Sequence, residues 1–262
     1  VLPDDSDVFY QNPFFPTVLR GISQVASDYD YAIQLSTGQD EKHRLENIKQ
    51  MIFGKRVDGL IFLYSKPNDP LVDFAIKNQF PFLILGKAVS PFVSLVDNDN
   101  IKAGYDATKY FLDQGYKKIA FLAGNKELVV SQDRFAGYKQ ALDEAGISLD
   151  ENIVKFSFGF LLEDSSYKIM EKMPIQEIEA FVTSDSMVAE GALHYLKDID
   201  YRFPIITFDS IKPRIDVDAY ININTLELGR ESFRTLLQII KDNKDDKHTC
   251  YRQVIPHSIL TR

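Results

Sequence analysis

Strand-like and helix-like segments alternate along almost the whole of this 262-residue chain. Short runs of β-branched and aromatic residues are followed by longer segments in which apolar residues recur with helical spacing. Predicted strands cover residues 31–36, 58–64, 82–86, 93–96, 118–123, 153–157, 180–183 and 205–208, with two short strands near Tyr251 and Ile259. Predicted helices cover 13–29, 40–54, 69–78, 100–114, 132–145, 162–172, 185–196 and 226–240. This order predicts an α/β fold with parallel sheets covered on both faces, because neighbouring parallel strands need crossover helices.

The predicted strands are too many for one compact sheet, and the pattern restarts near Gly115. We therefore predict two Rossmann-like lobes joined by crossover strands. The amino-terminal lobe is expected to comprise residues 1–111 and 226–246, and the carboxy-terminal lobe residues 115–222 and 250–262. Ligands of open α/β sheets bind beyond the carboxyl ends of the strands, so a ligand is expected in the cleft between the lobes.

Several classes of function are excluded by what the sequence lacks. It contains no phosphate-binding loop, no dinucleotide-binding glycine motif, no zinc-protease motif and no serine-hydrolase elbow. The single cysteine, Cys250, cannot form an internal disulfide, and the four histidines are far apart in sequence. We expect no enzyme activity, no cofactor and no metal site.

Net charge and hydropathy indicate the cellular location and the partners to expect for this chain. Thirty-eight acidic and thirty basic residues give a net charge of -8, which disfavours strong DNA binding by this chain alone. No apolar run approaches the roughly 20 residues that span a bilayer, and the first residues lack the features of a signal peptide. We expect a cytoplasmic protein without a membrane partner.

Seven short motifs occur in the order found in the effector-binding core of LacI/GalR repressors. The motifs are NPFF at 12–15, VDGLI at 57–61, DN at 99–100, QGYKKIA at 114–120, DRFAGY at 133–138, TSD at 183–185 and TFD at 207–209. Each motif is weak alone, but together they cover nearly the whole chain, which therefore resembles this family. The resemblance implies a periplasmic-binding-protein-like type I fold, homodimerisation, and operator binding through a helix-turn-helix head that we expect to be absent from this chain.

Three further segments are similar to one branch of that family, the maltose operon repressors of Gram-positive bacteria. They are FLYS at 62–65, GK at 86–87 and LVDNDN at 95–100. This similarity implies a sugar effector, maltose or a maltodextrin. The main alternative is an extracytoplasmic sugar-binding protein of a transporter with the same fold. A more distant alternative is a sugar-converting enzyme, although no partner acid or cofactor motif supports it.

Three charged residues are the strongest candidates for contacts with a sugar. Arg134 lies just inside a predicted helix, where its planar guanidinium could donate paired hydrogen bonds to vicinal hydroxyls or could cap that helix. Asp185 and Asp209 each follow an apolar strand, where a carboxylate can accept hydroxyl protons. Asp185 could also be the N-cap of the following helix, and the two roles are compatible.

Aromatic rings supply the flat apolar face against which a sugar ring stacks, although core packing is the rival role for each of them. The aromatic candidates for ligand binding are Phe14, Phe15, Tyr64 and Phe160, and two further candidates, Tyr10 and Asn12, rest on the family motif alone. Two positions depart from the family pattern: Ser184 stands where Asn is usual before Asp185, and Ile223 stands where Gln is common. These departures leave individual sugar contacts open.

Overall fold

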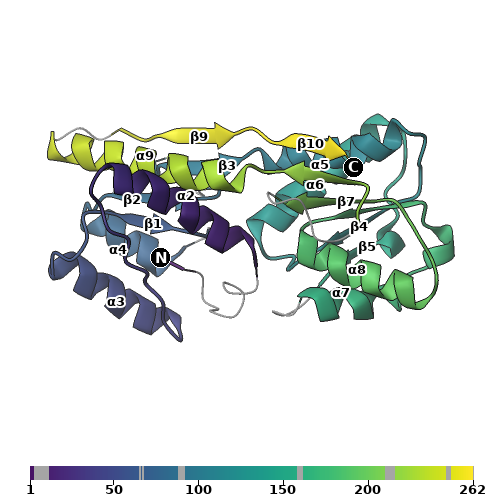
Figure 1. Ribbon diagram of the computed structural model, residues 1–262, viewed down its shortest axis with the longest axis horizontal. Helices are drawn as coiled ribbons and strands as arrows, with labels where there is room; N and C mark the ends of the chain where they lie inside the picture. Colours follow the sequence, from purple (N-terminus) through teal and green to yellow (C-terminus); the bar gives the residue numbers. More distant parts are fainter. Residues whose placement is uncertain are drawn as a thin grey trace. The chain divides into compact units, whose positions relative to one another are not determined.

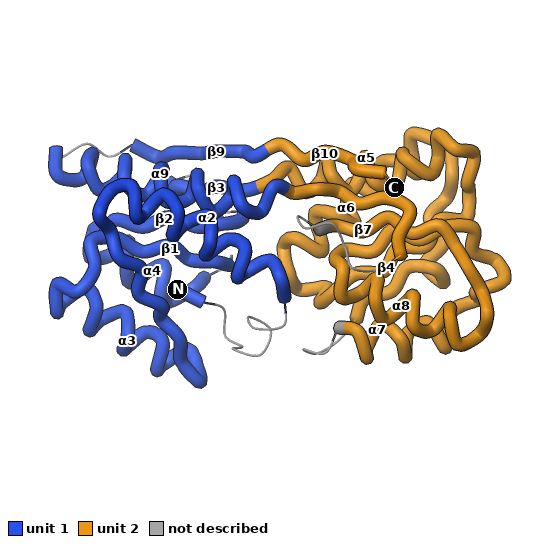
Figure 2. Tube along the Cα trace, in the orientation of Figure 1, with its two compact units in different colours: residues 1–97, 224–255 blue, residues 98–223, 256–262 orange. Residues whose placement is uncertain are grey.

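The chain folds into two compact units, each with its own sheet. The computed structural model describes residues 1–2, 12–64, 66, 68–87, 92–157, 162–209, 216–245 and 249–261. Unit 1 comprises residues 1–97 and 224–255, and unit 2 comprises residues 98–223 and 256–262 (Figure 2). In both units, mostly parallel strands lie between helices, which confirms the predicted α/β class.

The sheet of unit 1 has the strand order β1-β2-β3-β9, and β1, β2 and β3 are parallel neighbours. Helices α2 and α9 cover one face, and α3 and α4 cover the other (Figure 1). Leu60 and Phe62 therefore point toward α3 and α4, whereas Ile61 and Leu63 point toward α2 and α9. The bounds are α2 (Phe14–Asp28), α3 (Glu41–Phe53), β1 (Leu60–Phe62), α4 (Pro70–Lys77), β2 (Phe82–Leu85), β3 (Leu95–Asn98), α9 (Thr225–Lys244) and β9 (Arg252–Ile255).

The sheet of unit 2 has the order β10-β8-β7-β6-β4-β5, and only β10 runs antiparallel to its neighbour. Helices α5 and α6 pack together, as do α7 and α8 (Figure 1). All five residues of β4 are buried, as expected of a central parallel strand. The bounds are α5 (Asn100–Leu112), β4 (Ile119–Ala123), α6 (Val129–Glu144), η1 (Glu151–Ile153), β5 (Val154–Phe156), α7 (Leu162–Met170), η2 (Ile175–Glu177), β6 (Ala180–Thr183), α8 (Ser186–Asp198), β7 (Ile205–Asp209), β8 (Ala219–Asn222) and β10 (Ser258–Thr261).

The strand order places a topological switch point between β4 and β6. From β4 the chain moves outward to β5, and it then returns to the other side of β4 to form β6, β7 and β8 in succession. The connections after β4 and β6 therefore lead to opposite sides, and the carboxyl ends of these two strands lie at the switch point. In open α/β sheets this is the place where ligands bind.

Helices α5 and α6 are in direct backbone contact at two glycines. A Cβ atom at Gly137 would lie 1.9 Å from the carbonyl oxygen of Ile101, and one at Gly104 would lie 2.2 Å from that of Arg134. Only glycine allows so close an approach. The contact fixes the first turn of α5 beside the part of α6 that carries Arg134.

The unit boundaries differ from the predicted ones. Residues 98–111 belong to unit 2, and not to the amino-terminal part as expected, because α5 packs against α6. Residues 250–255 belong to unit 1 because β9 joins its sheet, and only residues 256–262 return to unit 2. The chain passes from unit 1 to unit 2 after Asp97 and returns to unit 1 between Ile223 and Asn224.

One secondary-structure prediction was wrong, and one strand was missed. Residues 31–36 do not form a strand, and in this segment Ser36 accepts a backbone hydrogen bond from Leu2 at 3.1 Å. Strand β8 was not predicted, although its residues are alternately buried and half-buried. Its short sequence, Ala219–Asn222, gives only two full periods of alternation, which is too few to recognise.

Among the residues that the structure describes, no helix combines the length and the apolar character needed to cross a bilayer.

The glycine contact between α5 and α6 predicts a large loss of stability for Gly137→Ala. The added methyl group must displace the backbone of α5, which should lower the free energy of unfolding by about 1–3 kcal/mol. Urea denaturation of Gly137→Ala and of Lys139→Ala, an exposed position on the same helix, checks this. The Lys139 variant should stay within about 0.5 kcal/mol of the parent. Equal effects of the two substitutions would contradict the packing argument.

Candidate functional site

Polar side chains meet at the switch point of unit 2. The hydroxyl of Ser184, directly after β6, accepts a hydrogen bond from the backbone N–H of Gly124, directly after β4, at 3.0 Å. The backbone N–H of Ser184 donates in turn to the carbonyl of Leu122 at 2.7 Å. The two strand ends are therefore joined, and the residues that follow them are held at one edge of the sheet. We call the set Asn98, Asn100, Arg134, Ser184 and Asp185 the switch-point cluster.

Arg134 is the centre of this cluster, and its side chain is buried. Only 7% of the residue is exposed. Its Nε donates to Oδ1 of Asn100 at 3.0 Å, and its Nη1 donates to the carbonyl oxygen of Ser184. The guanidinium also lies over the ring of Phe208, 4.1 Å from the ring centroid. These contacts fix the orientation of a planar cation that can donate paired hydrogen bonds.

The structure confirms one of the two roles suggested for Asp185, and its contact with a ligand stays a prediction. Asp185 is the N-cap of α8, and its Oδ1 accepts from the backbone N–H of Val188 at 3.0 Å. Its Oδ2 accepts from the hydroxyl of Ser184 at 2.9 Å. Burial raises the pKa of Asp185 above the ordinary value, although both hydrogen bonds and the charge of Arg134 act in the opposite direction. A carboxylate kept in such surroundings is a good acceptor for hydroxyl groups.

Two asparagines complete the cluster and were not predicted. Asn100, the first residue of α5, accepts from Arg134, and its Nδ2 lies 3.4 Å from the carbonyl oxygen of Asn98. Asn98 donates to the carbonyl oxygen of Ile223 at 3.0 Å. Their signal in the sequence is the polar run 97–100, which covers the end of β3 and the start of α5. Ile223 itself has a buried side chain and contributes its backbone here.

A second polar group lies after β1 in unit 1. Half-buried Tyr64 follows the strand, and Nη1 of Arg44 lies 3.4 Å from its hydroxyl oxygen. Burial raises the pKa of Tyr64, and the negative charge of Asp69 acts in the same direction. Both Arg44 and Asp69 are buried, and neither was predicted. Tyr64 is therefore part of a polar group, and its edge-to-face contact with Phe62 also ties it to the core.

The residues at the start of α2 have mainly structural contacts. Oδ1 of Asn12 accepts from the backbone N–H of Phe14 at 2.9 Å, so Asn12 supports the first turn of the helix. Phe15 is a buried member of the core between α2, α9 and the sheet, and Phe14 packs edge-to-face against it at 5.3 Å. Phe15 is therefore a core residue, and a contact between Phe15 and a ligand stays a prediction.

The side-chain contacts of three predicted residues are not described. Tyr10 and Phe160 lie outside the described residues. The backbone of Asp209 ends β7, next to β6 in the sheet, and pairs with Asn222 of β8. It is therefore on the same edge as Asp185, but its side chain is not described.

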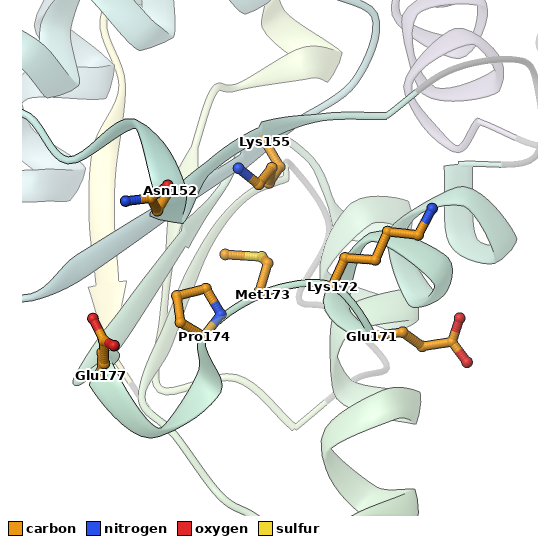
Figure 3. A pocket seen from close by; sticks show the side chains of 7 residues that line it. All are labelled: Asn152, Lys155, Glu171, Lys172, Met173, Pro174 and Glu177. Carbon is orange, nitrogen blue, oxygen red and sulfur yellow. The ribbon is translucent and has the colours of Figure 1, made fainter.

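A surface hollow of about 450 Å³ lies elsewhere in unit 2 (Figure 3). Its lining residues are Asn152, Lys155, Glu171, Lys172, Met173, Pro174 and Glu177. The charged ends of Glu171 and Lys172 extend away from Met173 and Pro174, so polar groups do not converge there (Figure 3). It contains none of the predicted ligand-binding residues and lacks the converging donors and acceptors of a ligand site.

The chain is similar to proteins of one family by sequence and by structure. Residues 1–202 match the family model described as periplasmic binding proteins and sugar-binding domain of LacI family. The HTH-type transcriptional regulator MalR of Streptococcus pneumoniae is 54% identical over 264 residues, which cover 100% of this chain and 80% of MalR.

Solved structures agree with the sequence comparison. A LacI-type transcriptional regulator of Bacillus cereus subsp. cytotoxis has a TM-score of 0.90 at 30% identity, with 100% of this chain and 95% of that chain covered. A structure described as the maltose operon transcriptional repressor MalR of Staphylococcus aureus has a TM-score of 0.85 over 100% of this chain and 95% of that chain. Its identity is 22%, so this likeness is one of fold.

The raised pKa of Asp185 predicts a particular pH dependence of stability. The pKa of Asp185 is higher in the folded chain than in the unfolded chain. At pH values between the two, the folded chain binds more protons than the unfolded chain, so the free energy of unfolding falls as pH rises through this range. Asp185→Asn keeps a helix-capping side chain and removes the titration. The stability of the parent relative to Asp185→Asn should therefore fall from acidic pH toward neutrality, as measured by urea denaturation at a series of pH values.

Asp150 provides a control of opposite sign. A hydrogen bond from the backbone N–H of Asn152 holds its pKa below the ordinary value. The stability of the parent relative to Asp150→Asn should therefore rise as pH increases through that range. The same slope for both variants would show that the environment of Asp185 has been misinterpreted.

Proposed function

This chain belongs to the LacI family of sugar-binding transcriptional regulators, and from that premise we propose that it senses maltose or a maltodextrin to control operator binding. The observation that carries this proposal is the switch-point cluster, in which Arg134 is held by Asn100 and Ser184 next to Asp185. Homodimerisation, operator DNA as the macromolecular partner and a cytoplasmic location are parts of the same proposal.

The cluster has the chemistry that recognition of a sugar requires. Each sugar hydroxyl can donate one hydrogen bond and accept others, so a sugar site needs donors and acceptors side by side. Arg134 and Asn100 supply donors, and Asp185 supplies an acceptor that is already oriented by two hydrogen bonds. Asp209, at the end of β7, is proposed as a second acceptor. Pre-oriented groups lose little conformational entropy when a ligand binds.

The choice of maltose is supported by sequence. The chain shares 54% of its residues with the MalR regulator of S. pneumoniae. Its segments FLYS at 62–65, GK at 86–87 and LVDNDN at 95–100 are also similar to those of maltose operon repressors. The polar group of Tyr64, Arg44 and Asp69 is proposed as a further contact for hydroxyl groups, because it too follows a strand end. That both units share one ligand stays a prediction.

Sugar binding is proposed to act by shifting the balance between two states of the regulator. A ligand shifts such a balance only by its difference in affinity for the two states. Moving a population from 1:99 to 99:1 requires about 5.5 kcal/mol. Hydrogen bonds to charged groups contribute about 1.5–3 kcal/mol each, so about two to four contacts that form in one state only would be enough.

Calorimetric titration with glucose, maltose, maltotriose, galactose and ribose tests the ligand class. We expect maltose or maltotriose to bind and galactose and ribose to bind much more weakly. Arg134→Lys keeps the charge but loses the planar fork, so it should weaken maltose binding about tenfold to a hundredfold.

Arg202→Lys is the matched control, because the Arg202 side chain is 82% exposed in the same unit. It should leave maltose affinity unchanged, and a thermal melt should show that both variants are folded. Absence of binding to every sugar would refute the proposal. Unchanged maltose affinity in folded Arg134→Lys would refute the assigned site.

A further inference from the structure

Two acidic side chains and one histidine meet on the outer side of α7 and α8. Glu190 and His194 lie four residues apart on α8, so they face the same side of that helix. Glu163 reaches them from the first turn of α7. One carboxylate oxygen of each glutamate and one imidazole nitrogen lie within 4.8 Å of one another. Nδ1 of His194 is 2.8 Å from Oε1 of Glu163.

The backbone holds these three residues together. A Cβ atom at Gly191 would lie 2.1 Å from the carbonyl oxygen of Glu163, so the two helices touch at the level of the cluster. One turn away, the buried hydroxyl of Ser166 donates to the carbonyl oxygen of Val188 at 3.0 Å. The spacing between Glu163 and the two residues on α8 is therefore set by packed backbone, and only side-chain rotation is needed to adjust it.

As an ion pair alone, the group would contribute little to stability, because an exposed histidine–carboxylate pair is screened by water. A second carboxylate close by adds repulsion between like charges, and one imidazole cannot fully neutralise both. A divalent cation would relieve that repulsion, because two carboxylates and a neutral imidazole supply a net charge of about -2.

We propose that Glu163, Glu190 and His194 form a binding site for a divalent transition-metal ion of the zinc type. Carboxylate oxygen and imidazole nitrogen ligate zinc at about 2.0–2.2 Å, and three such ligands with water complete a four-coordinate shell. The side chains of Glu163 and His194 are 41% and 55% exposed, so an ion and its water can reach the site. A bound ion would link α7 to α8. This site is separate from the switch-point cluster, so its test does not depend on the sugar proposal.

Equilibrium dialysis and calorimetry with zinc chloride test the site directly. All titrations use the Cys250→Ser background, because the exposed thiol of Cys250 can itself bind zinc. We expect one zinc ion per chain. Glu163→Gln, Glu190→Gln and His194→Ala should each weaken binding at least about tenfold, because each removes one of three ligands. Zinc should also raise the melting temperature of the background protein and not that of His194→Ala.

His43→Ala is the matched control. His43 is also exposed and lies 2.9 Å from Oδ2 of Asp40, but the described residues place no second carboxylate in a metal-binding group with it. This variant should bind zinc like the background protein. The proposal is overturned if the background protein takes up no zinc. It is equally overturned if folded Glu190→Gln and His194→Ala variants bind zinc with unchanged affinity.

Discussion

A buried guanidinium must be paired, and in this chain the pairing of Arg134 organises unit 2. An isolated charge removed from water costs many kcal/mol, so a buried arginine persists only with hydrogen-bond acceptors around it. Asn100 supplies one acceptor from the start of α5, and the carbonyl of Ser184 supplies another from the end of β6. Contacts between neighbouring elements determine the position of each acceptor. Asn100 is beside Arg134 because Gly104 and Gly137 let α5 and α6 touch, and Ser184 is in reach because its hydroxyl binds the backbone after β4.

Unit 1 also has a glycine contact between helices and a buried arginine, but it places them on opposite faces of its sheet. There α2 and α9 approach through Gly21 and Gly229, where an added Cβ would lie 2.2 Å from a carbonyl oxygen of the other helix. A buried arginine, Arg44, again lies by a strand end, and it donates to the carbonyl of Leu2 at 3.2 Å and approaches Tyr64. Both units therefore place a buried arginine beside the end of a strand, although only in unit 2 does a glycine contact position its partner. Such a scaffold holds polar groups rigidly, which suits the recognition of a small polar ligand.

Most of the fold could be predicted because its signals are local. Apolar runs such as Ile119–Ala123 and the helical spacing that follows them are visible in the sequence, and so are Arg134 and Asp185. What could not be predicted depends on contacts between distant segments. The membership of α5 in unit 2 follows from its packing on α6, and the role of Asn100 follows from Arg134, which lies 34 residues away. The burial of Phe15 could not be predicted either, because an aromatic residue at a helix start can face either the core or a ligand.

The central claim is that the switch-point cluster binds the sugar. A crystal structure of this chain grown with maltose tests it most directly. The account predicts sugar hydroxyl oxygens within about 3.2 Å of the guanidinium of Arg134 and of the carboxylate of Asp185. A sugar bound elsewhere on the chain, with both of these side chains in contact with protein and water only, would contradict it.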